Sequence, residues 1–158
     1  MRWIASSWIK RILLLCLVIF TSYIFYLNGL VRDEFSSDIE PIENVIQIQY
    51  SFDEYPRDLV NMLLLVEDQS FFHHSGVDFK EILRVIYGYL FEEKGLRGAS
   101  TITQQLIKNS LLSRDKTLSR KVEEALMAIL LELSYDKKFI LERYMNTVYL
   151  GQQGSTAF

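Results

Sequence analysis

Two adjacent carboxylates followed by histidine and glycine lie near the middle of the chain. Glu67 and Asp68 end an apolar run, and His74 and Gly76 follow them closely. Glu67 comes one helical turn after a pair of leucines, so we expect its carboxylate at the edge of apolar surface. Partial desolvation there would make it a better proton acceptor near neutral pH. The segment can therefore supply a general base, although two solvated acids at a helix end fit the same residues.

A loop of small and hydroxylated residues opens a second polar segment at 98–109. Gly98-Ala99-Ser100 leads into Thr101, which forms the capping-box pattern of a helix start with Gln104. Backbone N–H groups and hydroxyls at the positive end of a helix dipole bind anions. The segment therefore predicts a phosphate or carboxylate site, and on spacing alone an ordinary capped helix explains it as well.

Arg120, Lys121 and Glu124 form a charged group on a third predicted helix. At 100° per residue, Glu124 lies about 40° from Arg120 around the helix axis. The apolar residues of this helix lie about 180–240° from Arg120; they are Val122, Leu126, Ile129 and Leu133. We therefore expect Glu124 to point away from the core, between two cations. It would belong either to a site or to a surface ion-pair cluster worth a few tenths of a kcal/mol.

Helices are expected to carry all of these segments. A residue that favours a helix start precedes each run of apolar residues at helical spacing. Pro56 begins a predicted helix that ends at about 68, and Asp78 begins one that Gly95 stops. Thr101, Thr117 and Asp136 begin three more, which end at about 108, at 133 and at about 145. Apolar and polar residues alternate in the segment 45–50, which fits a short strand or an extended linker. The predicted core comprises Leu63, Val66, Ile82, Ile86, Leu126, Ile129 and Leu133.

An uncharged, apolar run from Ile12 to Val31 has about the length that a helix needs to cross a ~30 Å hydrocarbon layer. Arg2, Lys10 and Arg11 precede it, and this Lys/Arg bias predicts a cytoplasmic N terminus with the rest of the chain outside. A cleaved signal peptide is the alternative. Its apolar core is shorter, ~7–15 residues, and no small-x-small cleavage pattern follows this run, so we favour an uncleaved anchor.

Composition limits the other possibilities. The chain has 158 residues, a net charge of −3 and 13% aromatic residues, which fits one domain plus an anchor and gives no sign of disorder or of a basic nucleic-acid-binding protein. The single cysteine, Cys16, excludes an intramolecular disulfide and a cysteine metal site. Between Lys94 and Lys121, seven basic residues face only Asp115, a local surplus of six positive charges.

The polar segments occur together, in a fixed order, with a fourth near the end of the chain. The four patterns are Glu-Asp-x-x-Phe-x-x-His-x-Gly-x-Asp at 67–78, Gly-x-Ser-Thr-Ile-Thr-Gln-Gln-Leu-x-Lys-Asn at 98–109, Arg-Lys-x-x-Glu at 120–124 and Ile-Leu-x-x-Tyr-x-Asn-x-x-Tyr-x-Gly at 140–151. Over Tyr55 to Gly154 the chain thus resembles glycosyltransferase family 51, found in class A penicillin-binding proteins and monofunctional transglycosylases. The sequence Tyr149-Leu150-Gly151-Gln152-x-Gly154 resembles the penicillin-binding protein 1B branch.

The resemblance implies an all-α, lysozyme-like domain resting on the membrane, with lipid II as substrate. It implies that Glu67 is the general base, which takes the proton of the acceptor GlcNAc 4-hydroxyl as that oxygen attacks C1 of the donor MurNAc. Inversion then gives a β-1,4 glycan and releases undecaprenyl pyrophosphate. Glu124 would act near the pyrophosphate, directly or through a divalent cation such as Mg²⁺ or Mn²⁺, and no organic cofactor is expected.

The resemblance also implies a set of substrate-binding residues. Lys108, Lys116, Arg120 and Lys121 would hold the phosphates, and the surplus of positive charge would neutralise the departing pyrophosphate. The other expected substrate contacts are Asp68, Phe71, His74, Ser100, Thr101, Gln104 and Asn109. Expected partners are lipid II, the growing lipid-linked glycan, the membrane and cell-wall synthesis proteins, but no nucleic acid.

Two other functions fit parts of the pattern. One is a non-catalytic, membrane-tethered module that binds lipid II or a cell-wall partner. The other is a lytic transglycosylase, which the motif at 98–109 and the Arg-Lys-x-x-Glu group disfavour.

The family pattern continues beyond the point where this chain ends, at Phe158. The sequence therefore predicts a partial glycosyltransferase domain at 55–158 that does not polymerise lipid II by itself. A cytoplasmic tail at 1–11, an anchor at 12–31 and a juxtamembrane linker at 32–54 precede it. The expected location is the bacterial cytoplasmic membrane, as a single-pass protein with the domain on the extracytoplasmic side.

Overall fold

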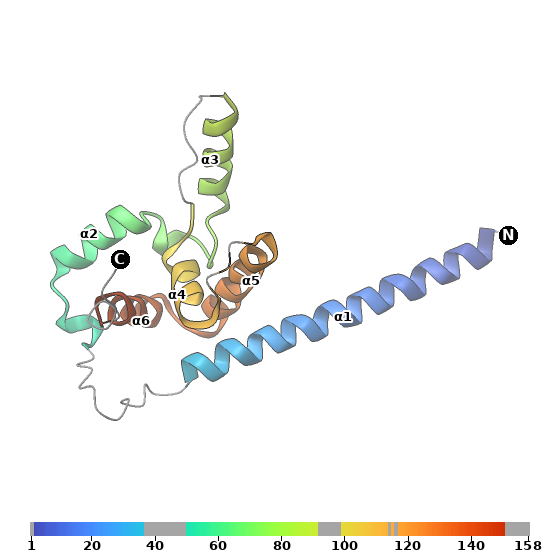
Figure 1. Ribbon diagram of the computed structural model, residues 1–158, viewed down its shortest axis with the longest axis horizontal. Helices are drawn as coiled ribbons and strands as arrows, with labels where there is room; N and C mark the ends of the chain where they lie inside the picture. Colours follow the sequence, from blue (N-terminus) through green and yellow to red (C-terminus); the bar gives the residue numbers. More distant parts are fainter. Residues whose placement is uncertain (1, 37–49, 92–98, 114, 116, 151–158) are drawn as a thin grey trace.

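The computed structural model describes residues 2–36, 50–91, 99–113, 115 and 117–150, and these are helical with short connections (Figure 1). The α-helices are α1 (Arg2–Ser36), α2 (Arg57–Glu67), α3 (Phe79–Phe91), α4 (Ile102–Leu111), α5 (Leu118–Ser134) and α6 (Lys137–Leu150), with 3-10 turns at Phe52–Glu54 and Phe71–His73. Within the described ranges, the sole β feature is an isolated bridge between Ser75 and Val77. The predicted all-α architecture is therefore confirmed.

Local capping signals start the helices where the sequence predicted them. The side-chain oxygens of Asp78, Thr101, Thr117 and Asp136 each accept a hydrogen bond from the backbone N–H group three residues further on, at 2.8–3.3 Å. These bonds satisfy donors that a helix start otherwise leaves unpaired. The helices α4 and α6 run on to Leu111 and Leu150, further than predicted.

The N-terminal helix is both a candidate membrane span and part of the domain. In the described part of the chain, α1 alone is long and apolar enough to cross a membrane. Most of its side chains from Trp8 to Tyr26 are exposed, a length of about 28 Å. Below this stretch Leu27, Val31 and Phe35 are buried in the domain core. The helix therefore continues beyond the predicted anchor end at Val31, and its last turns dock against the folded domain.

The core lies where α1, α4, α5 and α6 meet. Its fully or nearly fully buried members include Ile102, Leu106 and Ile107 of α4, Met127, Ala128 and Leu131 of α5, and Ile140, Leu141, Tyr144 and Met145 of α6. Helix α4 is central because it packs against both α5 and α6. The helix that Thr101 begins is thereby held by three neighbouring helices, α1, α5 and α6.

The buried face of α5 is the opposite of the predicted one. Glu124 is 1% exposed and shares its face with Met127, Ala128 and Leu131, whereas Val122 and Leu133 are 53% and 76% exposed. The prediction that Glu124 points away from the core is therefore wrong. Helices α1 and α4 cover the Glu124 side of α5, so packing selects that side although the other side is also apolar.

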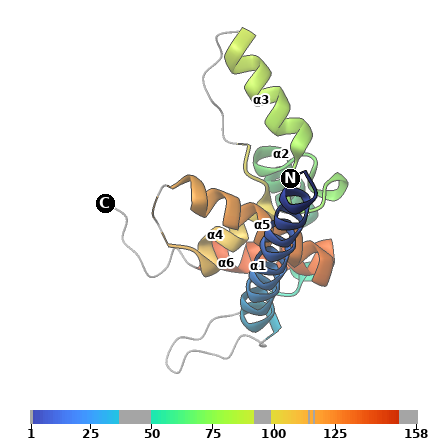
Figure 2. The ribbon, with the colours of Figure 1, turned by 90° about the vertical axis from the view of Figure 1, so that its right-hand side faces the viewer.

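Helix α3 projects away from the other helices (Figures 1 and 2). Among its described residues only Gly88 is buried, and Ile86 is 46% exposed. Val66, near the end of α2, is 73% exposed. The prediction of Val66, Ile86 and Leu133 as core residues is therefore wrong, because no described element covers them.

Two sequence predictions fall largely outside the described residues. The extended segment predicted at 45–50 is described only at Tyr50, and the helix stop predicted at Gly95 is not described.

Candidate functional site

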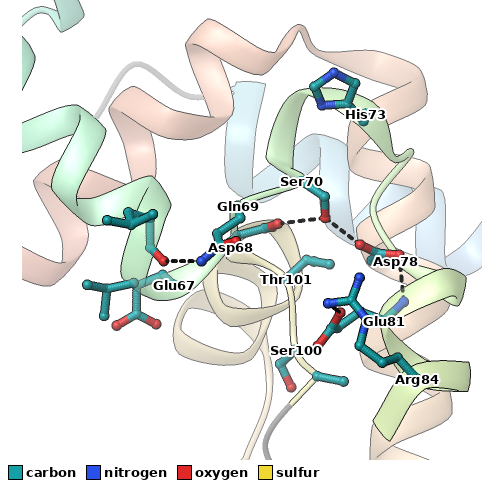
Figure 3. A pocket seen from close by; sticks show the side chains of 13 residues that line it. Glu67, Asp68, Gln69, Ser70, His73, Asp78, Glu81, Arg84, Ser100 and Thr101 are labelled. Atoms are coloured by element: carbon teal, nitrogen blue, oxygen red, sulfur yellow. Dashed lines mark hydrogen bonds and ion pairs between the residues drawn. The ribbon is translucent and has the colours of Figure 1, made fainter. Parts of the chain in front are cut away.

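A cleft of about 570 Å³ opens between the end of α2, the turn after it, the start of α3 and the start of α4 (Figure 3). Its walls are made by Leu65, Val66, Glu67, Asp68, Gln69, Ser70, His73, Asp78, Glu81, Arg84, Ala99, Ser100 and Thr101. The first two polar sequence segments therefore meet at one cleft.

Glu67 lies at the border of this cleft, at the last position of α2. Its side chain is exposed, so the predicted desolvation is not found among the described residues. Gln105 Nε2 donates to Glu67 Oε2 at 2.9 Å. The sequence interpretation selected Gln104 as the site glutamine and missed Gln105, the next residue of the same motif. Gln104 is 3% exposed and completes the capping box of Thr101.

Asp68 joins the end of α2 to the start of α4. It is 8% exposed, and its Oδ2 accepts a hydrogen bond from the backbone N–H of Ile102 at 3.0 Å. The same oxygen lies 2.9 Å from His74 Nε2. A carboxylate at the start of a helix is favoured by the helix dipole and by the unpaired N–H groups there. Asp68 therefore fixes the neighbouring Glu67 relative to α4.

The turn that carries His74 rests directly on α5. Gly76 has φ +87°, and a Cβ atom at this position would lie 2.6 Å from the carbonyl carbon and oxygen of Ala128. The carbonyl of Gly76 accepts a hydrogen bond from Thr101 Oγ1 at 2.6 Å. Both the backbone conformation and the close approach to α5 require glycine here.

Asp78 lies across the cleft from Glu67 (Figure 3). The hydroxyl of Ser70 donates to Asp78 Oδ2, and the backbone N–H of Glu81 donates to Asp78 Oδ1 at 2.9 Å. The hydrogen bond from Ser70 and then that from Glu81 lower the pKa of Asp78, because both stabilise its charged form. Arg84 pairs with Glu81 at 2.8 Å on the same wall.

The buried carboxylate of Glu124 is held between two cations. Lys121 Nζ contacts Glu124 Oε1, and Arg120 Nη1 lies 3.4 Å from Glu124 Oε2. Lys121 Nζ also donates to Ser100 Oγ at 2.7 Å. Since Ser100 lines the cleft, this bond connects the third polar segment to the other two. Arg120 Nε is buried and has no hydrogen-bond partner among the described atoms.

The remaining predicted site residues divide into buried and exposed groups. Phe71 is 1% exposed and His74 is half-buried, and neither is among the residues that line the cleft. Lys108 and Asn109 are exposed on α4, with Lys108 one turn beyond Gln105 on the same face. Lys116 is not among the described residues. The substrate contacts assigned to these residues stay predictions.

The surroundings of Glu124 do not fit a divalent cation. Both of its carboxylate oxygens already contact a basic side chain. Within the described ranges, no three His, Cys, Asp or Glu side chains come together as a metal-binding group.

Comparison with known proteins gives a consistent match. Residues 36–157 match the transglycosylase family. The chain is 43% identical over 114 residues to penicillin-binding protein 1B of Haemophilus influenzae, covering 72% of this chain and 15% of that protein. It is 47% identical over 105 residues to penicillin-binding protein 1B of Vibrio cholerae, covering 66% and 14%. It is 45% identical over 101 residues to penicillin-binding protein 1A of Aquifex aeolicus, covering 64% and 14%. The chain thus matches only about one seventh of the length of these relatives.

Proposed function

Because this chain belongs to the transglycosylase family, we propose that it supplies the cleft with which a peptidoglycan synthase polymerises lipid II. The observation that carries the proposal is that Ser100 connects the cleft to the charged group on α5. Its side chain lines the cleft that Glu67 borders and accepts a hydrogen bond from Lys121, which contacts Glu124. A proton acceptor at the cleft is thus linked, through Ser100, to a basic side chain suited to binding phosphate.

Glu67 is the general base of the proposed reaction. One carboxylate oxygen is held by Gln105, and the other makes no hydrogen bond among the described residues. The open oxygen accepts the proton of the acceptor GlcNAc 4-hydroxyl while that hydroxyl oxygen attacks C1 of the donor MurNAc. The bond from C1 to the pyrophosphate oxygen breaks as the new bond forms, so the configuration at C1 inverts. A positioned base of this kind typically contributes ~10²–10⁴ in rate.

The basic residues of α5 and α4 stabilise the leaving pyrophosphate. Glu124 pairs with Arg120 and Lys121, and Arg120 Nε has no hydrogen-bond partner among the described atoms. Lys108 is exposed on the face of α4 that carries Gln105. Charge-assisted hydrogen bonds to phosphate are stronger than neutral ones, and they gain strength as negative charge develops on the leaving group.

A second cavity, about 390 Å³, lies between α1, the end of α4 and the start of α5. One side is apolar, with Leu27, Leu30 and Met127 among its residues, and the other is polar, with Asp115, Arg120 and Glu123. The apolar side is the part that suits the polyprenyl chain of the substrate. We further propose that α1 spans the cytoplasmic membrane with its N terminus in the cytoplasm, as the Lys/Arg bias suggests.

The second candidate function is a non-catalytic module that binds lipid II or a cell-wall partner. The exposed position of Glu67 is compatible with it, since an exposed carboxylate needs no catalytic role. The hydrogen bond from Gln105 favours the enzyme, because it orients a side chain that would otherwise rotate freely.

The test compares glycan formation from labelled lipid II by the wild-type chain and by Glu67→Gln. The match covers 14% of the Vibrio cholerae relative. The wild type and Glu67→Gln are therefore each assayed in two forms: the 158-residue chain, and the same chain fused to the residues that follow the matched segment in that relative (the continued protein). We expect the continued wild-type protein to form polymer, and Glu67→Gln to lose it by ~10²-fold or more while still binding lipid II. Asp58→Asn, on the first turn of α2, is the matched control.

Three results would contradict the proposal. Polymer from Glu67→Gln at the wild-type rate would remove Glu67 as the base. Lipid II binding without turnover by the continued wild-type protein would support the non-catalytic module. Shortening of preformed glycan strands would indicate a lytic enzyme.

A further inference from the structure

Tyr144 is connected to Glu67 through a single glutamine. Tyr144 lies on α6 and is 3% exposed. Its hydroxyl donates to Gln105 Oε1 at 3.0 Å, and Gln105 Nε2 donates to Glu67 Oε2 at 2.9 Å. Resting on the function proposed above, we propose that Tyr144 is a positioning residue for Glu67, which it orients by fixing the direction of the Gln105 side-chain amide.

The donors and acceptors of these three side chains allow one arrangement when Glu67 is ionised. A carboxylate only accepts hydrogen bonds, so Gln105 must turn its NH₂ group toward Glu67. The amide oxygen of Gln105 then faces Tyr144, whose hydroxyl must donate to it. A rotated amide would bring its oxygen against the carboxylate and its NH₂ group toward the hydroxyl. The ionised carboxylate thus sets the direction of the amide, and the hydroxyl of Tyr144 stabilises that direction by donating to the amide oxygen.

Tyr144 remains a donor over the whole physiological range. Burial, and then the negative charge of Glu67, raise the pKa of Tyr144 to about 12. Both effects on the pKa follow from the position of the phenol, which is enclosed by the core and lies near the carboxylate of Glu67. At neutral pH the hydroxyl therefore keeps its proton and stays available as a donor to Gln105 Oε1.

The consequence of this chain of bonds lies in the geometry of the base. Glu67 is exposed, and a glutamate side chain has several rotatable bonds, so its carboxylate would otherwise sample many directions. The bond from Gln105 holds Oε2, and Oε1 makes no hydrogen bond among the described residues. A misplacement of ~1 Å in a reacting group can cost ~10²-fold in rate. Orientation through Tyr144 therefore acts on the turnover number rather than on substrate affinity.

A spectroscopic test needs no turnover. The full chain with ¹⁵N-labelled glutamine is studied by NMR in detergent micelles, and the side-chain amide signal of Gln105 is assigned by its loss in Gln105→Leu. We expect both Tyr144→Phe and Glu67→Ala to move this signal. Tyr135→Phe is the matched control, because Tyr135 stacks on Phe139 in the core, with ring centroids 4.5 Å apart. An unchanged Gln105 signal in Tyr144→Phe would overturn the proposal.

A kinetic test separates positioning from packing. In the protein used for the Glu67→Gln assay, we expect Tyr144→Phe to lower kcat roughly tenfold with KM unchanged. The melting temperature should fall by only a few degrees, because one hydrogen bond is lost. In a Gln105→Leu background the same substitution should have no further effect, because the intermediary is gone. Independent, multiplicative losses from the two substitutions, or a normal kcat in Tyr144→Phe, would refute the role of Tyr144.

The two proposals fail in different ways. Turnover by Glu67→Gln would remove the base and with it the proposed mechanism. A dead Glu67→Gln beside a fully active Tyr144→Phe would leave the mechanism intact and remove only the positioning role.

Discussion

Substitution of Gly76 by alanine should separate the turn after α2 from helix α5. A Cβ atom at position 76 would lie 2.6 Å from both the carbonyl carbon and the carbonyl oxygen of Ala128, and 2.7 Å from the backbone nitrogen of Ile129. These are backbone atoms of a packed helix, so no side-chain rotation can relieve the contact. The turn must move away from α5, or α5 must shift within the core.

The cost can be worked out from two contributions. A left-handed backbone conformation, φ +87° at Gly76, costs a residue with a Cβ atom roughly 1–2 kcal/mol. Overpacking against a helix adds about 1–3 kcal/mol. The sum, about 2–5 kcal/mol, is a large part of the ~5–15 kcal/mol that stabilises a typical domain. For a domain of roughly 100 residues, each kcal/mol lowers the melting temperature by about 4–8 °C, so we expect a fall of at least about 8 °C.

The assay is thermal unfolding in detergent, followed by near-ultraviolet circular dichroism, which reports on packed aromatic side chains. Gly29→Ala is the matched control, since nothing lies within 4 Å of a Cβ atom at that position of α1. It should melt no lower than the wild type, since alanine is the better helix former. We also expect Gly76→Ala to lose the hydrogen bond from Thr101 Oγ1 to the carbonyl of Gly76, which now measures 2.6 Å.

The same substitution should impair the cleft. The turn carries His74, which contacts Asp68, and Asp68 in turn fixes the start of α4. A displaced turn therefore moves Glu67 relative to Gln105. A melting temperature for Gly76→Ala within about 1 °C of the wild type would show that the turn does not depend on this contact, and the argument from packing would be refuted.

Two further predictions concern the charged groups on either side of the cleft. Lys121→Met should lower the free energy of unfolding by about 1–3 kcal/mol, because it removes a charge-assisted contact from the buried Glu124. Denaturant titration measures this loss. An unchanged midpoint, or an equal loss in Lys121→Arg, would contradict the prediction. The pKa of Asp78 lies below its usual value of 3.8, chiefly because Ser70 donates to it. Its contribution to stability is thus present above about pH 4 and is lost as the pH falls through the lowered pKa. Asp78→Asn should flatten the acid limb of stability against pH, and a limb as steep as that of the wild type would exclude this role.

The starts of the helices could be predicted from the sequence. Thr101, Thr117 and Asp136 are the observed N-caps, and the bond of each spans only three residues. Such signals act within one turn of the chain, so they need no knowledge of the neighbours. The apolar run of α1 is equally local, because hydrocarbon thickness sets its length. The position of Glu67 beside a cleft followed from the resemblance rather than from local physics.

The buried side of each helix was decided by the tertiary structure. Helix α5 carries apolar residues on two sides, and the helical wheel selected the side of Val122 and Leu133, which is largely exposed. Packing of α1 and α4 buried the other side, including Glu124. Burial of that carboxylate is tolerated because Arg120 and Lys121 pair with it. A sequence read in isolation cannot show which side its neighbours cover.

The choice between two adjacent glutamines was also made by tertiary contacts. Successive residues of a helix point about 100° apart, so Gln104 and Gln105 cannot serve the same surface. Gln104 turns inward to the cap of its own helix, and Gln105 meets Glu67 from α2 and Tyr144 from α6. The sequence alone determined which residue types were available and where the helices begin. Which side chains meet was decided by the packing of α2, α4 and α6, because contacts between residues nearly forty positions apart exist only in the folded chain.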